Sequence, residues 1–274
     1  MNFSALRRIT ILILAVTVAV TVFCTAAAAQ QRPLLTEDPR VIAEGSLVAE
    51  TGFGYQHRAR FPVSGLTGDL YQILTSGLHF GIGKRAEFQM TGTLHNYLRL
   101  QNGAGSRNDW GDLALSTKIK IVEESRSLPI ISFRPTVVLP NSNRTKGIGT
   151  DGTDFFGDIL IGKKTGTAFI FGNVGLGILD DANRPQSQHD VLTYGIAAAV
   201  PAGNRVSVLG EWNGYHNAQK HPSAGGESRG QARLGLQLKA GGITFDVAAT
   251  AGTTHWDHKA GVVAGMTKAF QLWH

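Results

Sequence analysis

Histidine is the commonest metal ligand in proteins, and near the C-terminal end of this chain two histidines lie close to an aspartate. His255 and His258 flank Asp257 in a segment without regular apolar spacing, and imidazole and carboxylate groups are ligands that Zn²⁺ accepts. A metal-capture site there is one hypothesis. We favour the alternative of solvated loop histidines, because no two of them have the spacing of a rigid element, and we predict no metal ligand and no cofactor. The histidines in or beside such segments are His57, His189, His216, His221, His255 and His258.

Two glycine-rich segments resemble nucleotide-binding motifs. Residues 147–152 read Gly-Ile-Gly-Thr-Asp-Gly, which matches the dinucleotide fingerprint G-x-G-x-x-G. That fingerprint needs a helix to follow it, whereas here a strand pattern follows at once. Residues 162–166, Gly-Lys-Lys-Thr-Gly, lack the spacing of a phosphate-binding loop. Both segments are predicted to be loops or turns without a nucleotide.

A third set of candidate residues is charged. Each of them lies in the sequence among apolar or small residues. Rings of such side chains set solute selectivity where they line a pore. Alternatively, charges of both signs satisfy one another and fill the interior. The candidate lumen and selectivity residues are Glu87, Asp112, Lys118, Arg134, Asp158, Glu211, Arg233 and Asp246. In either case, an element of regular structure must place them on one surface.

That element is the β-strand, because apolar and polar residues alternate with period two. From Ala86 to Leu98 one set of alternate positions is apolar apart from Asn96, and the other set is polar. From Gln231 to Lys239 the alternation is equally regular. The same analysis predicts twelve strands near 46–56, 69–82, 86–99, 110–122, 128–139, 154–163, 168–178, 189–200, 205–216, 230–239, 243–253 and 259–270.

The connections between these strands also alternate in length. Those after the odd-numbered strands are mostly long and polar: 57–68, 100–109, 140–153, 179–188, 217–229 and 254–258. Those after the even-numbered strands are tight: 83–85, 123–127, 164–167, 201–204 and 240–242. An even number of antiparallel strands with short turns at one end and long loops at the other is typical of an outer-membrane barrel. We predict an all-β fold, a transmembrane antiparallel up-and-down β-barrel of about 12 strands, closed because an open sheet edge in lipid would lack hydrogen-bond partners.

Insertion into a membrane determines which residues of each strand face lipid and which face the lumen. A Lys or Arg on the lipid side at mid-depth costs about 2–4 kcal/mol, so the charged candidates should face the lumen. The apolar partners should face lipid, and aromatic residues near the strand ends should form interfacial girdles. A secreted β-sandwich or lipocalin-like barrel, with apolar residues inside, is the alternative. The lipid-facing residues predicted for two strands are Leu113, Leu115, Ile119, Ile121, Ile131, Phe133, Val137 and Leu139, and the predicted girdle includes Tyr55, Tyr97, Trp110 and Tyr215 at one end and Phe80 and Phe88 at the other.

The N-terminus predicts export. Arg7 and Arg8 precede an apolar run from Ile9 to Phe23, and the small residues Ala26 to Ala29 follow. This order is that of a secretory signal peptide, residues 1–29, with an uncleaved membrane anchor as the alternative. The predicted mature chain has a periplasmic N-terminal segment, 30–45, and an outer-membrane β-barrel, 46–274. The only cysteine, Cys24, leaves with the signal peptide, so the mature chain has no disulfide.

The charge balance argues against nucleic acid as a partner. Loss of Arg7 and Arg8 lowers the net charge from +6 to +4, and no basic run tracks a phosphate backbone. The expected partners are membrane lipid and a small-molecule solute, and we expect a monomer.

Short motifs along the chain resemble a family of bacterial outer-membrane proteins associated with the meta-pathway of phenol degradation, whose members are often called transporters. The resemblance implies a barrel linked to the uptake of aromatic compounds, and it carries over no catalytic or binding residue. It rests on Arg32-Pro33-Leu34-Leu35-Thr36-Glu37-Asp38-Pro39, Glu44-Gly45, Glu50-Thr51-Gly52-Phe53-Gly54-Tyr55, Gly111-Asp112-Leu113-Ala114-Leu115 with Lys118, Leu139-Pro140, Gly152-Thr153-Asp154-Phe155 and Asp190-Val191-Leu192-Thr193-Tyr194-Gly195.

The predicted function is an outer-membrane channel or transporter for passive uptake of small solutes, including aromatic or hydrophobic compounds. Twelve strands lie between the packed eight-stranded barrels and the open sixteen-stranded porins, so the lumen can be a narrow channel or plugged, for instance by residues 30–45. One alternative is a non-conducting structural or ligand-binding barrel. The other is a lipid-modifying enzyme, but His79 and His95 lie on inward faces and no Ser/His/acid set faces lipid, so we predict no catalytic residue and no enzyme.

Overall fold

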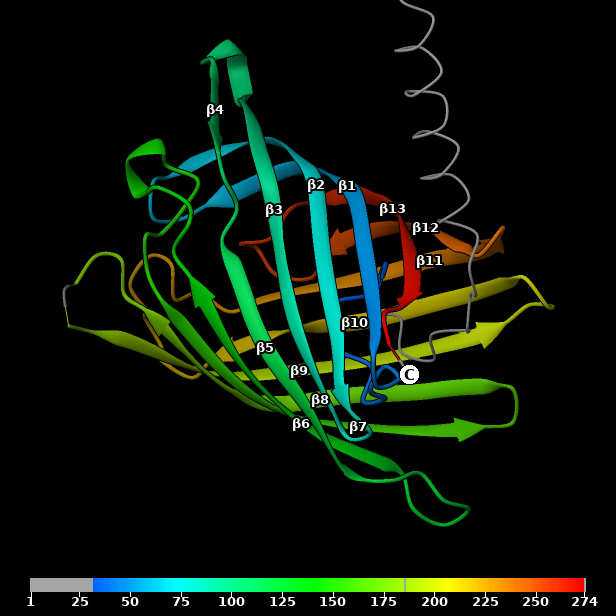
Figure 1. Cartoon of the computed structure of the whole chain (residues 1–274). Helices are drawn as coiled ribbons and strands as arrows, with labels where there is room; N and C mark the ends of the chain where they lie inside the picture. Colours follow the sequence, from blue (N-terminus) through cyan, green and yellow to red (C-terminus); the bar gives the residue numbers. More distant parts are fainter. Residues whose placement is uncertain (1–31, 185, 274) are drawn as a thin grey trace, which may run out of the picture.

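The computed structural model describes residues 32–184 and 186–273, and the predicted signal peptide lies outside the described residues. The described part is one antiparallel sheet with two single-turn 3₁₀ helices, η1 (Gln101–Gly103) and η2 (Arg144–Lys146) (Figure 1). Its strands are β1 (Ser46–Phe61), β2 (Leu66–Gly83), β3 (Ala86–Leu100), β4 (Ser106–Asp109), β5 (Leu113–Val122), β6 (Ile130–Leu139), β7 (Asp154–Thr165), β8 (Ala168–Asp180), β9 (Gln188–Pro201), β10 (Val206–Asn217), β11 (Arg229–Ala240), β12 (Ile243–Gly252) and β13 (Ala260–Gln271).

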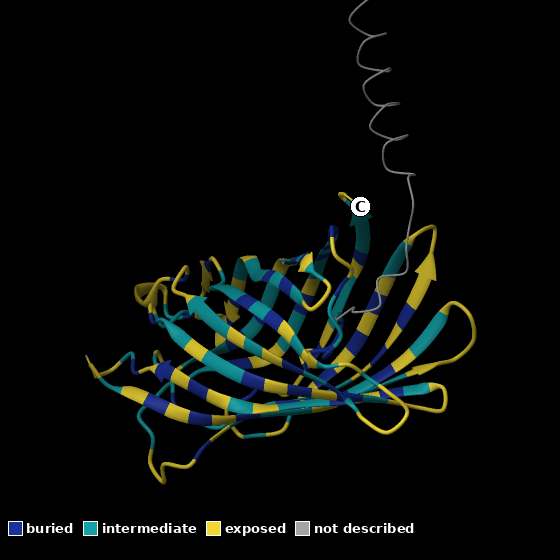
Figure 2. Cartoon of the chain, turned by 60° about the horizontal axis from the view of Figure 1, so that its bottom comes forward, coloured by how far each residue is buried: buried dark blue, intermediate teal, exposed yellow. Residues whose placement is uncertain are grey.

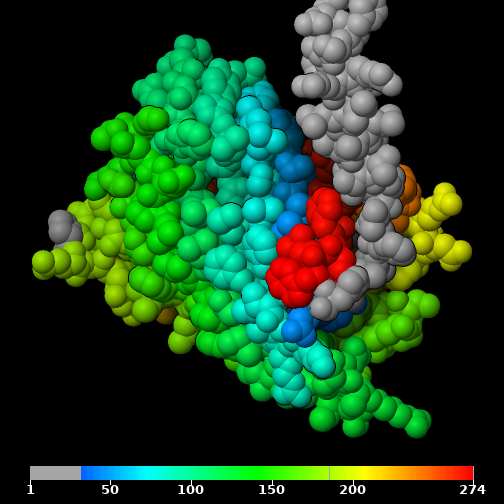
Figure 3. All heavy atoms as spheres, in the orientation of Figure 1, coloured from blue at the N-terminus to red at the C-terminus, as the bar shows by residue number. Residues whose placement is uncertain are grey.

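The sheet closes on itself. The first and last strands pair in antiparallel register from Ser46 with Gln271 to His57 with Ala260, and Figure 3 shows β13 lying against β1. β4 is only an outward extension that pairs with the end of β3, and β5 takes its place in the wall. The wall therefore has the twelve strands that the sequence predicts, and the predicted barrel is confirmed.

Alternation places each side chain on one of the two faces of the wall, as the banding of burial along every strand shows (Figure 2). Outward apolar residues are exposed: Leu176 and Leu234 keep 68% and 67% of their surface. Inward charged residues, such as Lys118 on the same strand as the exposed Ile119, are buried. The pattern is the reverse of a soluble barrel and fits an exterior in contact with lipid. Among the described residues, no helix is long and apolar enough to cross a membrane.

The segment 57–68, predicted as a loop, is mostly strand. β1 continues to Phe61 and β2 begins at Leu66, so only four residues connect them. The pairing of β1 with β2 shifts register twice, between Gln56 and Ala59 on β1 and at Leu74 on β2. Arg58 and Leu74, which lie at these shifts, have positive φ values of 54° and 53° although neither is glycine. Such bulges interrupt the alternation and bend a strand pair. The two predicted strands therefore ended where the period-two alternation ended. In the structure the β1–β2 hairpin continues beyond that point and leans over the end of the barrel (Figure 1).

The aromatic girdle is confirmed only in part. Tyr55, Tyr71 and Tyr97 form an outward ladder on β1, β2 and β3, with ring centroids 5.2 and 6.1 Å apart. Tyr215, which the sequence analysis assigned to the girdle, instead points into the lumen, because it shares its alternate positions with the buried Glu211 and Asn213.

Candidate functional site

The segment that precedes β1 lies inside the barrel. Residues 32–45 enter beside the C-terminal end of the chain, where the backbone N–H groups of Leu272 and Trp273 donate to the carbonyl of Gly45. Gly45 has a φ of 74°, and a Cβ atom there would lie 2.3 Å from the carbonyl oxygen of Trp273. Glycine is therefore needed for the chain to turn inward at this point. We call residues 32–45 the plug segment.

The plug segment passes along the inner wall from β3 to β12. Its contacts follow the order of the strands around the barrel, beginning with Ile42, whose N–H donates to Glu87 on β3 at 2.6 Å. Pro39 follows, and its carbonyl accepts a hydrogen bond from Ser132 on β6 at 2.6 Å. The segment ends at Arg32, which pairs with Asp246 on β12 at 3.3 Å. The plug segment therefore follows the wall around much of the barrel interior rather than lining one side of it.

A buried ion-pair cluster holds the middle of the plug segment. The ammonium group of Lys118, 1% exposed, lies 2.7 Å from Glu37 and 3.0 Å from Glu87. It also donates to the carbonyl of Asp38 at 2.8 Å, and Arg134 lies 3.7 Å from the other carboxylate oxygen of Glu37. Burial alone would raise the pKa of Glu37, but the charges of Lys118 and Arg134 outweigh burial and lower this pKa to about 2.

A second cluster binds the backbone of the plug segment. The carboxylate of Glu211 on β10 accepts hydrogen bonds from the N–H groups of Leu35, at 2.9 and 3.0 Å, and Thr36, at 2.7 Å. Arg233 on β11 donates to the carbonyl of Pro33 and lies 3.5 Å from Glu211. Hydrogen bonds of this kind, with one charged partner, are stronger than neutral ones, and they satisfy backbone groups that have no strand to pair with.

On the side of the short turns, apolar contacts also hold the plug segment. Leu34 is buried in the lumen against Phe171 and Leu209. The guanidinium of Arg40 lies 4.2 Å from the centroid of the Phe169 ring. The plug segment is thus held by both polar and apolar contacts.

The eight predicted lumen residues all have inward-facing side chains, and they divide into two groups. Glu87, Lys118, Arg134, Glu211, Arg233 and Asp246 contact the plug segment. Asp112 and Asp158 instead line a cavity between the plug segment and the long loops, and Arg134 lines this cavity as well. The plug residues Arg32, Glu37 and Thr36 were not among the predicted site residues. Five of the eight predicted lumen residues are acidic and three are basic, and this imbalance was a signal for an additional inward cation such as Arg32.

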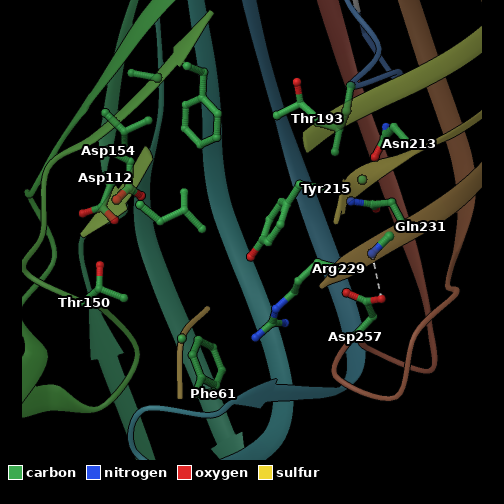
Figure 4. A pocket seen from close by; sticks show the side chains of 18 of the residues that line it. Phe61, Asp112, Thr150, Asp154, Thr193, Asn213, Tyr215, Arg229, Gln231 and Asp257 are labelled. Carbon is green, nitrogen blue, oxygen red and sulfur yellow. Dashed lines mark hydrogen bonds between the residues drawn. The ribbon is translucent and has the colours of Figure 1, made fainter. Parts of the chain in front are cut away.

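The cavity has a volume of about 820 Å³. Leu35 and Thr36 of the plug segment line it at one end, and at the other end it is lined by Phe61 to Val63 of the bent β1–β2 hairpin and by the β6–β7 loop. Its sides carry both aromatic and charged groups, as Figure 4 shows for Tyr215, Asp154 and Arg229. The cavity is large enough for a small organic molecule.

Loop contacts narrow the mouth of the barrel above this cavity. Ser64, in the turn between β1 and β2, donates to the carbonyl of Gly147 in the β6–β7 loop at 2.6 Å. Arg60 donates to the carbonyl of His255 in the β12–β13 loop at 2.6 Å. Residues 147–152, the nucleotide-like motif of the sequence, lie in the β6–β7 loop and open no helix, as predicted. The hairpin and two loops thus meet above the cavity.

The loop histidines lie in separate places. His255 contacts Arg60 and His258 contacts Thr250, so neither joins the other at a common centre. Within residues 32–184 and 186–273, no group of three potential ligands from His, Cys, Asp and Glu is placed to hold a metal ion.

One Ser/His/acid group does form in the loops. Ser223 lies 3.0 Å from Nε2 of His189, and Asp181 lies 3.5 Å from the same nitrogen. In a catalytic relay the acid contacts the opposite ring nitrogen and the serine donates to the histidine. Here the serine hydroxyl donates to Asp181 at 2.6 Å, and Nδ1 of His189 has no hydrogen-bond partner in the described structure. The group is arranged as a link between two loops.

Known proteins provide a comparison for the fold. No family model matches the chain, and no curated protein matches it. The solved structure of the COG4313 outer membrane channel from Pseudomonas putida F1 is similar, with a TM-score of 0.63, 11% identity and coverage of 85% of this chain and 98% of that one. The NanC porin is also similar, with a TM-score of 0.53, 10% identity and coverage of 81% and 98%. The predicted fold, that of an outer-membrane β-barrel, is confirmed.

Proposed function

We propose that the protein is an outer-membrane channel for the passive passage of small solutes, and that solutes pass when the plug segment leaves its contacts with the wall. The supporting observation is the cavity of about 820 Å³ that lies between the mouth loops and the plug segment. A solute that enters this cavity meets Leu35 and Thr36 as the obstacle to further passage. The two similar solved structures, described as a channel and a porin, support this class of function.

The polar nature of the plug contacts supports a movable segment. Glu37, Arg32 and the N–H groups of Leu35 and Thr36 are bound to side chains of the wall, and water or ions can replace such partners when the segment moves. A segment meant only to fill the barrel would be stabilised at least as well by an apolar lumen.

A disulfide across the plug contact tests the proposal. A Cβ atom built on Gly195 lies 2.8 Å from Oγ1 of Thr36, close to the separation of about 3 Å between Cβ and the distal sulfur in a disulfide. The variant Thr36→Cys/Gly195→Cys places a thiol on each side, and the predicted mature chain contains no other cysteine. We expect the oxidised double variant to show little single-channel conductance in a planar bilayer, and a reductant to restore the conductance of the wild type.

The two single-cysteine variants are the controls, and they should not respond to reductant. Equal conductance of the oxidised and reduced double variants would contradict a moving plug segment. Silence of the wild type, when heat-modifiable migration on a gel shows that it is folded, would favour the alternative of a non-conducting binding barrel.

The proposal includes aromatic or hydrophobic compounds among the solutes. The family resemblance of the sequence supports this choice, and Phe61, Phe156 and Tyr215 give the cavity apolar ring surfaces. Current block by phenol, compared with cyclohexanol of similar size, measures the preference for an aromatic ring. Equal block by the two compounds would argue that ring stacking plays no part.

A further inference from the structure

Two carboxylates on one side of the cavity have no cationic partner. Asp112, beside β5, accepts hydrogen bonds from the N–H groups of Asn141 and Ser142, at 3.0 and 2.9 Å. Asp154 on β7 accepts one from the N–H of Asp180 at 2.9 Å. Within the part of the chain that the structure describes, neither aspartate takes part in a salt bridge. Backbone hydrogen bonds fix these carboxylates in place without neutralising them.

Two arginine guanidinium groups on the other side of the cavity are held by backbone carbonyl groups. Arg229 on β11 donates to the carbonyl of Trp256 at 2.8 Å and to that of Arg60 at 3.3 Å. Arg60 on β1 donates to the carbonyl of His255. Neither arginine is in a salt bridge among residues 32–184 and 186–273. Both line the cavity and keep their charge, while carbonyl oxygens restrict their movement.

The opposite charges face one space. In Figure 4, Asp112 and Asp154 lie on one side of Tyr215, and Arg229 lies beneath it, beside Asp257. The low-dielectric wall strengthens the field that such fixed charges produce across a cavity. A molecule in that field is oriented when it carries a positive and a negative group at its two ends.

Unpartnered polar atoms at the plug end of the cavity also indicate a ligand. Oγ1 of Thr36, a residue that is 1% exposed, and Nδ2 of Asn213, a residue that is 9% exposed, have no hydrogen-bond partner in the described structure. Both residues line the cavity. Leaving a buried donor without a partner is unfavourable, so these groups are expected to bond to whatever occupies the space.

We propose that the cavity binds small zwitterions, with the ammonium group toward Asp112 and Asp154 and the carboxylate toward Arg229 and Arg60. A zwitterion supplies the partner that each wall lacks and adds no net charge to the lumen, whereas a simple anion or cation satisfies one wall only. The inference rests on the proposed function in so far as the bound zwitterion is taken to be the solute that passes.

Calorimetric titration of the folded mature protein in detergent micelles at low salt tests the proposal. The probes are 4-aminobutyrate and 6-aminohexanoate, with hexanoate and hexylammonium as single-charge analogues. We expect the better of the two zwitterions to bind at least about tenfold more tightly than either analogue, since each charge-assisted contact contributes on that scale. Equal binding of hexanoate or hexylammonium, or no binding of either zwitterion, would overturn the proposal.

Variants assign the two ends of the ligand. Asp154→Asn should weaken 6-aminohexanoate about tenfold and leave hexanoate unchanged, and Arg229→Gln should weaken 6-aminohexanoate and leave hexylammonium unchanged. Asp190→Asn and Arg107→Gln are matched controls on exposed residues outside the cavity, and they should bind like the wild type. If Asp154→Asn does not fold, as judged by heat-modifiable migration, Asp112→Asn takes its place. Loss of affinity for all probes alike, in a folded variant, would contradict the assigned ends.

Binding and conduction fail separately in this design. Calorimetry needs no membrane, so selective binding without single-channel conductance would keep the zwitterion site and overturn the channel. Conductance without selective binding would keep the channel and overturn the zwitterion site.

Discussion

The ammonium nitrogen of Lys118 lies 2.7 Å from a carboxylate oxygen of Glu37, and this pair joins the barrel wall to the plug segment inside the lumen. Both side chains are almost fully buried, at 1% and 3% exposure. The same ammonium group lies 3.0 Å from Glu87, which itself binds the backbone of Ile42. One wall cation thus compensates two carboxylates, one on the wall and one on the plug segment.

Replacing Lys118 by methionine should release the plug segment. The variant leaves Glu37 and Glu87 buried without their shared cation, and breaking a buried pair in this way costs about 3–5 kcal/mol. Undocking hydrates Glu37, so we expect faster trypsin cleavage after Arg40 in the folded barrel and a higher open probability in a bilayer.

Lys120→Met is the matched control on the same strand. Lys120 pairs with Glu123 at the β5–β6 turn rather than with the plug segment, so trypsin should cleave this variant at the rate of the wild type. Adding Glu37→Gln to Lys118→Met should recover part of the lost docking, because one of the two carboxylates that had Lys118 as their cation is removed. Cleavage of Lys118→Met no faster than that of Lys120→Met would show that the pair does not hold the plug segment.

Acid should open the channel, and the direction follows from Glu37. The neighbouring cations lower the pKa of Glu37 from its ordinary 4.5 to about 2 in the docked state. The released segment therefore binds a proton more readily than the docked one, and the stabilisation is complete above about pH 4.5 and lost as the pH falls toward 2. A shift of this size corresponds to roughly 3 kcal/mol of docking free energy.

Single-channel recordings at a series of pH values measure this effect. We expect constant open probability from about pH 5 to pH 8 and a rise as the pH falls through the window below 4.5. The variant Glu37→Gln has no carboxyl group at this position. Its open probability should therefore lack the part of the rise that protonation of Glu37 causes. A rise centred near neutral pH would instead point to histidine.

Gly45→Ala should disturb the entry of the plug segment. The added Cβ meets the carbonyl oxygen of Trp273 at 2.3 Å, in a backbone conformation with a φ of 74° that side chains rarely adopt. Gly65→Ala is the control, because Gly65 has a similar φ of 71° and open space around it. Each variant loses about 1 kcal/mol to backbone strain, and only Gly45→Ala adds the clash. Urea unfolding from lipid bilayers should show the larger loss for Gly45→Ala, and equal losses would mean that Trp273 moves aside.

Leu234→Arg tests which face meets lipid. Leu234 lies in the middle of β11 with 67% of its surface exposed, so an arginine there should destabilise the barrel in a bilayer by about 2–4 kcal/mol. Leu128, 53% exposed in the β5–β6 turn, is the control site where arginine should cost close to nothing. Free energies of unfolding measured in lipid vesicles provide the comparison. Similar values for the two variants would favour a water-exposed exterior.

The barrel was predictable from the alternation of apolar and polar residues. Period-two alternation depends only on neighbouring residues, since successive side chains of a strand point to opposite faces. It therefore located twelve strands and placed residues such as Lys118 and Ile119 on opposite faces of the wall. Closure followed from the same pattern, because strands with an apolar exterior need lipid, and lipid tolerates no open edge.

The periodicity was informative only while the backbone remained regular. Arg58 and Leu74 adopt positive φ without being glycine, and no residue type marks these bulges in advance. The bent hairpin that covers the cavity was for that reason predicted as a loop. Tyr215 was placed in the girdle on its residue type, although its alternate position, shared with Glu211, already pointed inward.

The tertiary structure alone decided what the lumen contains. The plug segment has no periodic pattern, and its partners lie far away in the sequence: Glu87 is 45 residues from Ile42, Glu211 is 176 from Leu35 and Asp246 is 214 from Arg32. These partners come together only when the sheet closes, so no local rule can pair them. The set of inward charges was therefore predictable. Which of them bind the plug segment and which line the cavity depends on the path of that segment. This path is set by side chains of the closed wall, because the segment has no strand partner.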